Sequence, residues 1–372
     1  MRVLHVISDE NIGGAGVLLT SLLRNFDRER VESTVALPAG SALIGRVEAL
    51  GVPIRLLHAP ADRYSTASVR EISDLIRETG SDLVHANAAL NARIAGRRCG
   101  VGVLHTRHCC FPVKGFLRFP LFRVVCGLGN RMLSDRVIAT AEAAAQNLRE
   151  LGIGEGQIDV VINGSEPVRE VGETELAAWR QRWGLREDDF VVGICARLEE
   201  YKGHETFLRA ARLLLERRPQ RRFRFLIVGE GSRRTSLERM AEELEIFPWV
   251  VFCGFMEDMA PIYRLLRVNV NCSSGTETSC LALSEGMSAA LPSVVSDFGG
   301  NRAMMGESDA GFVIPVGDFA AVAEAIERIA CDAELEKRMR DAARVRYLER
   351  YTAKSMADQV TVIYEKLMKD RS

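Results

Sequence analysis

The chain has 372 residues, of which 47% are hydrophobic and 27% charged, and its 49 basic residues nearly balance its 50 acidic ones for a formal net charge of −1. This length suffices for two domains, and the near-neutral charge argues against nucleic acid as a partner. The nine cysteines lack a disulfide-like spacing, no apolar run reaches about eighteen residues, and only a short apolar stretch follows Met1, so we expect a cytoplasmic protein without signal peptide or membrane span.

The first strand pattern, over residues 3–8, leads into a glycine-rich turn. The turn contains Gly13, Gly14 and Gly16, and a helix is predicted after it over about residues 17–26. Glycines at such a turn let a ligand approach the backbone. The last glycine of a dinucleotide fingerprint is missing, which argues against a dehydrogenase.

Five more apolar runs continue this alternation of strands and helical patterns. They predict strands over residues 33–37, 54–57, 82–86, 101–106 and 136–140. Such alternation predicts a parallel, doubly wound sheet, whose ligands bind at the carboxyl ends of the strands. His108 follows one of these strands at that end, and Asn163-Gly164 marks the turn that closes this half.

A base-rich segment covers residues 93–134. It holds eight basic residues and no acidic one, and aromatic residues are interspersed among them. The basic residues are Arg93, Arg97, Arg98, Arg107, Lys114, Arg118, Arg123 and Arg131. This mixture suits an anionic lipid surface or a phosphate-bearing lipid acceptor. The alternative interpretation is an acceptor-side loop and helix whose apolar face packs on the sheet.

The second half starts with another buried-strand pattern, over residues 190–196. Arg197 and Lys202 lie on the loop after it, where two cations can face one diphosphate. The next strand pattern, over residues 223–228, ends in a turn at Gly229. Further strands are predicted over residues 250–254, 268–272 and 311–315, and helices over 205–216, 320–330, 333–348 and 355–368.

Residues 273–301 carry the most informative pattern of the chain. The pattern predicts a strand, then a loop of small residues, then a helix that starts near Thr278 or Ser279. Free backbone N–H groups and the positive end of the helix dipole would then lie together and form a phosphate-binding site. Glu277 and Glu285 lie on either side of this site, on the order of 10 Å apart at about 1.5 Å per helical residue. A nucleoside diphosphate sugar has a similar spread between ribose and hexose, so each carboxylate could accept hydrogen bonds from one of them.

These motifs resemble those of the retaining glycosyltransferases of GT-B fold, family 4. The resemblance rests on the Glu-x7-Glu pair and its flanks, on Arg-x4-Lys-Gly at 197–203, on Thr-x-His ending at His108, and on Asn163-Gly164. It implies two Rossmann-like, doubly wound parallel-sheet domains facing a central cleft. The implied domains are an acceptor-binding domain over residues 1–165, a nucleotide-sugar-binding domain over 166–350, and a C-terminal helix over 351–372 that crosses back to the first domain.

The resemblance also implies roles for individual residues. His108 would contact the donor sugar near the reacting carbon, and Arg197 and Lys202 would neutralise charge on the leaving nucleotide; with Glu277 they form the expected catalytic set. The expected donor-binding residues are Gly13, Gly14, Gly16, Gly229, Ser279, Cys280, Leu281 and Glu285. The two glutamates are too far apart for the acid and nucleophile of a retaining hydrolase, about 5 Å apart, so we expect a front-face transfer. With no Asp-x-Asp in the sequence, we expect neither a catalytic metal nor another cofactor.

The expected activity is transfer of a sugar from a nucleotide-diphosphate sugar to a glycan or lipid-linked acceptor in bacterial surface polysaccharide or glycolipid synthesis. Two alternatives stay open: a catalytically idle sugar-nucleotide-binding subunit, and a nucleotide-sugar epimerase. We expect the protein in the cytoplasm at the inner face of the cell membrane, with contact to anionic membrane through residues 93–134 and without nucleic acid.

Overall fold

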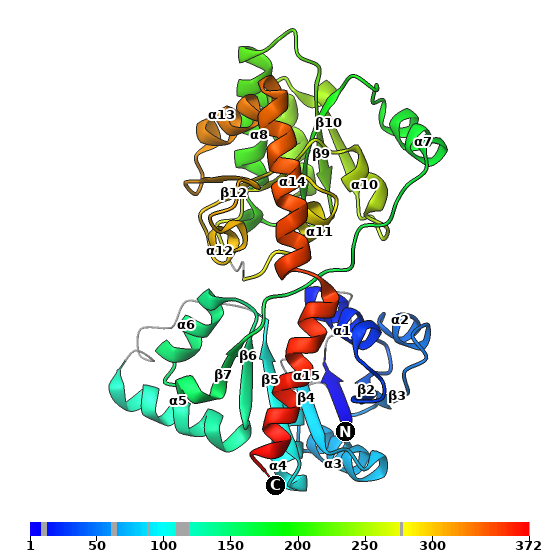
Figure 1. The fold of residues 1–372 in the computed structure, drawn as a ribbon, viewed down its shortest axis with the longest axis vertical. Coiled ribbons are helices and arrows are strands. Elements are labelled where there is room, and N and C mark those ends of the chain that lie inside the picture. The colour runs from blue at the N-terminus through cyan, green and yellow to red at the C-terminus, as the bar shows by residue number, and fades with distance from the viewer. Residues whose placement is uncertain (9–12, 61–64, 88, 109–118, 276–277, 372) are drawn as a thin grey trace. The chain divides into compact units, whose positions relative to one another are not determined.

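The computed structural model describes residues 1–371 except 9–12, 61–64, 88, 109–118 and 276–277. Contacts divide the chain into two compact units (Figure 1). Unit 1 consists of Met1–Ser165 and Thr352–Ser372, and unit 2 of Glu166–Tyr351. Each unit is built on its own parallel sheet with helices on both faces, so the predicted doubly wound α/β fold is confirmed.

The sheet of unit 1 has seven strands in the order β3-β2-β1-β4-β5-β6-β7, all parallel. In chain order the strands are β1 (Arg2–Ile7), β2 (Glu32–Pro38), β3 (Ile54–Leu57), β4 (Leu83–Asn87), β5 (Gly102–Arg107), β6 (Arg136–Ala139) and β7 (Ile158–Val160). The chain runs outward from β1 to β3 and then returns to build β4 on the other side of β1. The strand order therefore reverses between β1 and β4, which is where such sheets bind ligands.

Helices cover both faces of this sheet. They are α1 (Gly14–Asn25), α2 (Ile44–Glu48), α3 (Thr66–Thr79), α4 (Leu90–Cys99), α5 (Pro120–Leu133), α6 (Glu142–Glu150) and α15 (Ala353–Lys369). Residues that alternate along a strand point to opposite faces, so Ile7 packs with α1 and α2 while Leu4 and Val6 pack with α3 and α4.

The last helix, α15, belongs to unit 1 although it follows unit 2 in the chain. It contacts α1 and β5, and its buried residues recur at helical spacing: Met356, Val360, Ile363, Tyr364 and Leu367. Thr352 caps its start by accepting a hydrogen bond from the backbone N–H of Ser355 at 3.2 Å.

Three neighbouring strands of unit 1 each carry a buried histidine; His5 and His85 share one face of the sheet, and His105 lies on the other. His5 of β1 stands opposite His85 of β4, and Ala86 of β4 stands opposite His105 of β5. His85 is hydrogen-bonded to the Tyr364 hydroxyl and to the Thr106 hydroxyl, each at 2.6 Å. Burial lowers the pKa of His5 to about 3 and that of His85 and His105 well below the ordinary value, so all three are neutral at pH 7.

The sheet of unit 2 has six strands in the order β10-β9-β8-β11-β12-β13, again all parallel. The strands are β8 (Phe190–Cys195), β9 (Phe223–Val228), β10 (Val250–Gly254), β11 (Val268–Asn271), β12 (Ser293–Ser296) and β13 (Gly311–Ile314). The helices are α7 (Glu173–Trp183), α8 (His204–Arg217), α9 (Arg234–Glu243), α10 (Ala260–Leu265), α11 (Leu281–Ser288), α12 (Asn301–Met305), α13 (Phe319–Cys331) and α14 (Ala333–Arg350). Here the strand order reverses between β8 and β11.

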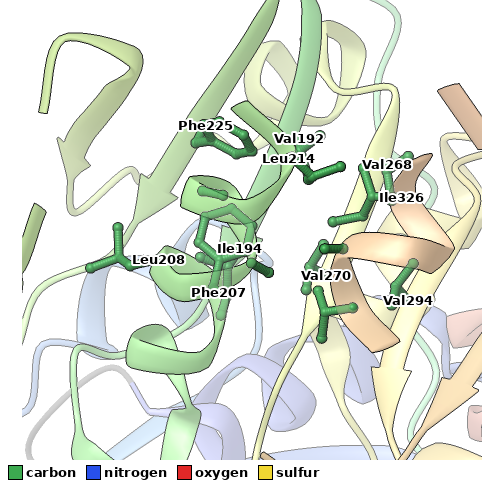
Figure 2. Close-up of a cluster of buried hydrophobic side chains, with 14 of the residues drawn as sticks. Val192, Ile194, Phe207, Leu208, Leu214, Phe225, Val268, Val270, Val294 and Ile326 are labelled. Atoms are coloured by element: carbon green, nitrogen blue, oxygen red, sulfur yellow. The ribbon is translucent and has the colours of Figure 1, made fainter. Parts of the chain in front are cut away.

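The largest core of unit 2 lies between the sheet and helices α8 and α13. Figure 2 shows alternate residues of four strands facing this side, among them Val192 and Ile194 of β8 and Val268 and Val270 of β11. Phe207 of α8 packs against them. The opposite face of the sheet packs against α7 and α10. Both faces of the strands are therefore buried, which explains their nearly continuous apolar sequences.

Two elements near the motif at residues 273–301 differ from expectation. Helix α11 starts at Leu281 rather than near Thr278 or Ser279, and Cys280 holds the N-cap position. Thr278 and Ser279 are buried in the preceding loop. Strand β12 was not predicted, since two valines between serines after a proline resemble a loop as much as a buried strand.

Candidate active site

The reversal of strand order between β8 and β11 brings together the loops that follow these two strands. The backbone N–H of Ser274, after β11, donates to the carbonyl of Tyr201, after β8, at 2.8 Å. A Cβ atom on Gly203 would lie 2.1 Å from the carbonyl oxygen of Cys272, and Gly203 has φ +72°. Only glycine fits at this position. The loop with the two cations is therefore fixed against the loop that leads to α11.

The loop after β8 presents both cations beside one aromatic ring. Arg197 is exposed and donates to the Tyr201 hydroxyl at 2.6 Å. The Lys202 ammonium lies 5.6 Å from the centroid of the same ring, within cation–π range. Tyr201 and Lys202 belong to a short 3-10 helix, η3 (Glu200–Lys202). Two positive side chains thus lie on one loop at the carboxyl end of β8, and such groups can bind an anionic ligand.

The start of α11 lies at the same edge of the sheet. The side chain of Cys280 makes no capping hydrogen bond to the first turn. Its sulfur instead accepts a hydrogen bond from the Asn271 amide at 3.0 Å, which ties the helix start to the end of β11. A helix start without a side-chain cap presents its N–H groups and the positive end of its dipole to an anion.

Glu285 lies one turn further along α11. Its Oε2 atom accepts a hydrogen bond from the Tyr263 hydroxyl at 2.8 Å. Burial raises the pKa of Glu285, and the hydrogen bond from Tyr263 opposes that rise. Glu277, the other member of the pair, lies outside the described residues, so the expected separation of about 10 Å stays a prediction.

The turn after β9 packs closely on the loop after β8. A Cβ atom on Gly229, at φ +135°, would lie 2.1 Å from the carbonyl oxygen of Ala196. The Leu198 N–H donates to the carbonyl of Glu230 at 3.0 Å, and Glu199 accepts from the Ser232 hydroxyl at 3.0 Å. Gly229 is therefore needed for the close approach of two loops that flank the candidate site.

In unit 1 the glycine turn and His108 follow different strands. Helix α1 begins at Gly14, earlier than the predicted residue 17, with Gly13 as its N-cap. Gly14 is exposed, whereas a Cβ on Gly16 would lie 2.7 Å from the Leu43 side chain. Gly16 therefore permits the packing of α1 on Leu43. Any contact of these glycines with a ligand stays a prediction.

His108 follows β5 and is hydrogen-bonded through Nε2 to the Asn87 side-chain oxygen at 3.1 Å. Since an amide oxygen only accepts, this contact places a proton on Nε2. Burial lowers the pKa of His108 to about 4, so the ring is neutral at pH 7. A small cavity of about 20 Å³ lies beside the His108 ring and is lined by Asn87, His108 and Asn163 among others. A neutral, oriented imidazole can hydrogen-bond a sugar hydroxyl, and that role stays a prediction.

Unit 2 thus brings together Arg197, Lys202, Gly229, Glu285 and the segment Ser279–Leu281. Sequence reasoning missed three side chains that contact predicted site residues: Tyr201, Tyr263 and Asn87. Tyr201 stands four residues after Arg197 and within the same motif, so its position gave a signal. Tyr263 and Asn87 gave none, because their contacts depend on the packing of separate elements.

Two family models match the chain, and together they span most of it. The model described as Glycosyltransferase Family 4 matches residues 12–169, and the one described as Glycosyl transferases group 1 matches residues 177–346. The chain belongs to the family 4, group 1 glycosyltransferases.

Relatives of this glycosyltransferase extend over its length. EpsD of Bacillus subtilis, named as a glycosyltransferase, is 29% identical over 343 residues, which cover 87% of each chain. A D-inositol 3-phosphate glycosyltransferase of Corynebacterium urealyticum is 27% identical over 387 residues, covering 95% of this chain and 91% of the relative.

Solved structures share the fold of this glycosyltransferase. HepE of Anabaena in complex with UDP aligns with a TM-score of 0.84 at 20% identity, covering 98% of this chain and 100% of HepE. A glycosyltransferase of Rickettsia africae aligns with a TM-score of 0.85 at 16% identity, covering 99% of this chain and 98% of the Rickettsia chain. The GT-B architecture expected from the sequence is thereby confirmed.

Two other features are absent from the described residues. Among them, no group of three or more His, Cys, Asp or Glu side chains is arranged to hold a metal ion. None of the described helices combines the length and the apolar character needed to cross a membrane.

Proposed function

We propose that this glycosyltransferase moves a sugar, with retention of anomeric configuration, from a nucleotide-diphosphate sugar to a glycan or lipid-linked acceptor. The observation that carries the proposal is the meeting, at the strand-order reversal of unit 2, of two cations and a helix start without a side-chain cap. HepE, which shares the fold, was solved with UDP and with UDP-glucose. We assign the same class of donor to this chain.

The donor is placed by its charges and its hydroxyl groups. The diphosphate faces Arg197, Lys202 and the first turn of α11, and the carboxylate of Glu285 accepts hydrogen bonds from the ribose. The turn at Gly229 lies beside the nucleobase. Glu277 accepts hydrogen bonds from the hexose hydroxyls.

The transfer breaks the bond between the anomeric carbon and the diphosphate oxygen and forms a bond from that carbon to the acceptor oxygen on the same face. The acceptor hydroxyl gives its proton to the leaving diphosphate. Negative charge grows on the diphosphate as the bond breaks, and Arg197, Lys202 and the helix start stabilise it. These groups supply the positive charge that a metal ion would otherwise provide, so we propose a reaction without metal.

The test is hydrolysis of UDP-, GDP- and ADP-sugars by the purified protein in EDTA, followed by proton NMR. We expect one class of donor to be hydrolysed slowly, because water replaces the acceptor on the same face. The first sugar released should keep the anomeric configuration of the donor. Binding without turnover, even after membrane lipids are added, would favour the idle binding subunit. A new sugar epimer would favour the epimerase.

The exposed apolar side chains of helix α5 support the proposal that the acceptor lies at a membrane surface. Of its 14 residues only Asn130 is buried, whereas Leu121 is 72% exposed and Met132 74% exposed. Leu121, Val124, Val125, Leu128 and Met132 recur at helical spacing and form a stripe about 100° wide, which we call the α5 stripe. The interpretation of an apolar face packed on the sheet is therefore wrong for this helix.

The inner side of α5 is held by polar groups and by backbone contact. Arg93 of α4 donates to the Asn130 side-chain oxygen at 2.6 Å and to the Ser134 hydroxyl at 2.8 Å. A Cβ on Gly127 would lie 2.1 Å from the carbonyl oxygen of Gly152, so the helix sits directly on the loop after α6 (Figure 1). The α5 stripe is thus not needed to attach the helix to unit 1.

We propose that an anionic membrane covers the α5 stripe. Arg123 and Arg131 lie on the same helix, and residues 93–134 contain eight bases and no acid. Two copies of this surface would repel each other, whereas an anionic bilayer attracts the bases and accepts the apolar side chains. Lys114 and Arg118 lie outside the described residues. We therefore propose that the enzyme acts at the inner face of the cell membrane, beside lipid-linked acceptors.

Sedimentation with phosphatidylglycerol vesicles tests this surface. We expect Leu128→Asp to weaken binding at least about tenfold, since burial of a leucine contributes about 1.5–3 kcal/mol. Binding of the wild type should fall with salt and be weak to phosphatidylcholine vesicles. Val362→Asp is the matched control, because Val362 is 58% exposed on α15 of the same unit. Equal loss in both variants, or a dimer that Leu128→Asp dissociates, would contradict the membrane proposal.

A further inference from the structure

Tyr263 connects the buried core of unit 2 to a predicted donor-binding carboxylate. Its side chain is 1% exposed, and its hydroxyl donates to Glu285 Oε2 at 2.8 Å. The two residues belong to different helices, α10 and α11. The hydrogen bond therefore joins two elements whose sequence separation gives no reason for contact.

Packing holds the tyrosine ring in place. Tyr263 lies in a core cluster with Ile262, Leu265 and Leu291, among others. The next residue, Arg264, faces the surface and donates to the carbonyl of Val168 at 2.9 Å. The core packs against the ring, and the bond from Arg264 to Val168 holds the helix that carries it. The Tyr263 hydroxyl therefore has little freedom to move.

Glu285 itself has three rotatable side-chain bonds and needs an external contact to hold one orientation. Among the described residues, Tyr263 alone donates a hydrogen bond to the Glu285 carboxylate. That bond occupies Oε2 and leaves Oε1 available as an acceptor. A vicinal diol such as ribose requires an acceptor at a defined position.

We propose that Tyr263 is a positioning residue: it orients the Glu285 carboxylate so that Oε1 receives the ribose hydroxyls of the donor. This inference rests on the proposed function, in which Glu285 binds the ribose. It predicts that the tyrosine hydroxyl affects donor affinity far more than the rate of the chemical step. The ring, by contrast, serves the core, so phenylalanine should preserve folding.

The groups around Glu285 determine how its protonation depends on pH. The titratable groups that face it among the described residues are Tyr263 of α10 and the thiol of Cys195 at the end of β8. Burial raises the pKa of the Tyr263 hydroxyl and of the Cys195 thiol well above their ordinary values, so both are neutral at working pH. Because the bond from Tyr263 lowers the pKa of Glu285, its removal shifts the protonation of this carboxyl toward higher pH.

The experiment measures binding of UDP, GDP and ADP to the wild type and then uses the tightest ligand with the variants. We expect Tyr263→Phe to raise its dissociation constant roughly tenfold at pH 7.5 and more at pH 6, with kcat for donor hydrolysis within about twofold of wild type. The 2′,3′-dideoxy form of the same nucleotide should bind wild type and Tyr263→Phe equally. In a Glu285→Gln background, Tyr263→Phe should change binding by less than about twofold.

Tyr351→Phe is the matched control. Tyr351 is also buried in unit 2, and its hydroxyl donates to the carbonyl of Met304 at 2.9 Å, away from Glu285. The inference is overturned if folded Tyr263→Phe binds the nucleotide with wild-type affinity and pH dependence, or if its effect adds fully to that of Glu285→Gln. A wild type that binds none of the three nucleotides would instead overturn the proposed function, and this inference with it.

Discussion

Lys202→Ala should lower kcat for sugar transfer by about two to three orders of magnitude, the usual cost of removing one group that stabilises transition-state charge. The ammonium lies on the loop after β8, beside the Tyr201 ring and on the same loop as Arg197. Charge on the diphosphate is greatest when its bond to the sugar is breaking. Loss of a cation there therefore affects kcat more than the affinity for the intact donor.

Lys337→Ala is the control for this variant, because Lys337 is exposed on α14 of the same unit. It should keep the wild-type rate. Melting temperatures of both variants show whether the fold is intact. A folded Lys202→Ala protein that transfers sugar at the wild-type rate would contradict the role given to the ammonium group.

Mild acid should unfold unit 1 before unit 2. Four of the five histidines whose pKa is lowered by burial, His5, His85, His105 and His108, lie in unit 1, and only His204 lies in unit 2. Burial lowers the pKa of His5 to about 3 and that of His108 and His204 to about 4, and holds those of His85 and His105 well below the ordinary value.

The sign of the effect follows from proton binding. As the pH falls below about 6.5, the unfolded chain takes up protons on these histidines while the folded chain does not, so the free energy of unfolding decreases. The stabilising contribution is complete above this pH and is lost progressively toward pH 4 to 3. Each histidine contributes up to about 1.4 kcal/mol per pH unit. Four of them acting together would exhaust a typical domain stability of about 5–15 kcal/mol within a few pH units.

Urea unfolding at pH 7.5, 6 and 5 measures this loss. His5→Leu should make the pH dependence of unit 1 shallower by about 1.4 kcal/mol per pH unit, because it removes one buried titrating group. His58→Gln is the control, since His58 is exposed. A free energy of unfolding that stays constant from pH 7.5 to 5 would show that these histidines are not buried in their neutral form.

The sequence predicts the sheets and the loops that carry the cations because those features depend on local patterns. Apolar runs predicted β9 and β10 at their observed bounds. The position of Lys202 at the carboxyl end of β8 follows from the same reasoning.

Other features depend on which elements pack together, and no local pattern predicts them. The apolar periodicity of α5 is the same whether its stripe faces a core or the surface, so the sequence alone could not decide between packing on the sheet and exposure. The bond between Tyr263 and Glu285 needs α10 and α11 side by side. The start of α11 at Leu281 depends on burial of Thr278 and Ser279, which the capping preference of these residues did not indicate.

Whether unit 2 binds and activates a nucleotide sugar is tested most directly by the NMR assay of donor hydrolysis in EDTA. The predicted result is slow release of sugar with retained configuration from one class of donor by the wild type, and its loss in Lys202→Ala and Glu285→Ala. Release of the inverted sugar would contradict the same-face transfer. No binding or hydrolysis of any UDP-, GDP- or ADP-sugar would contradict the assignment of the donor site itself.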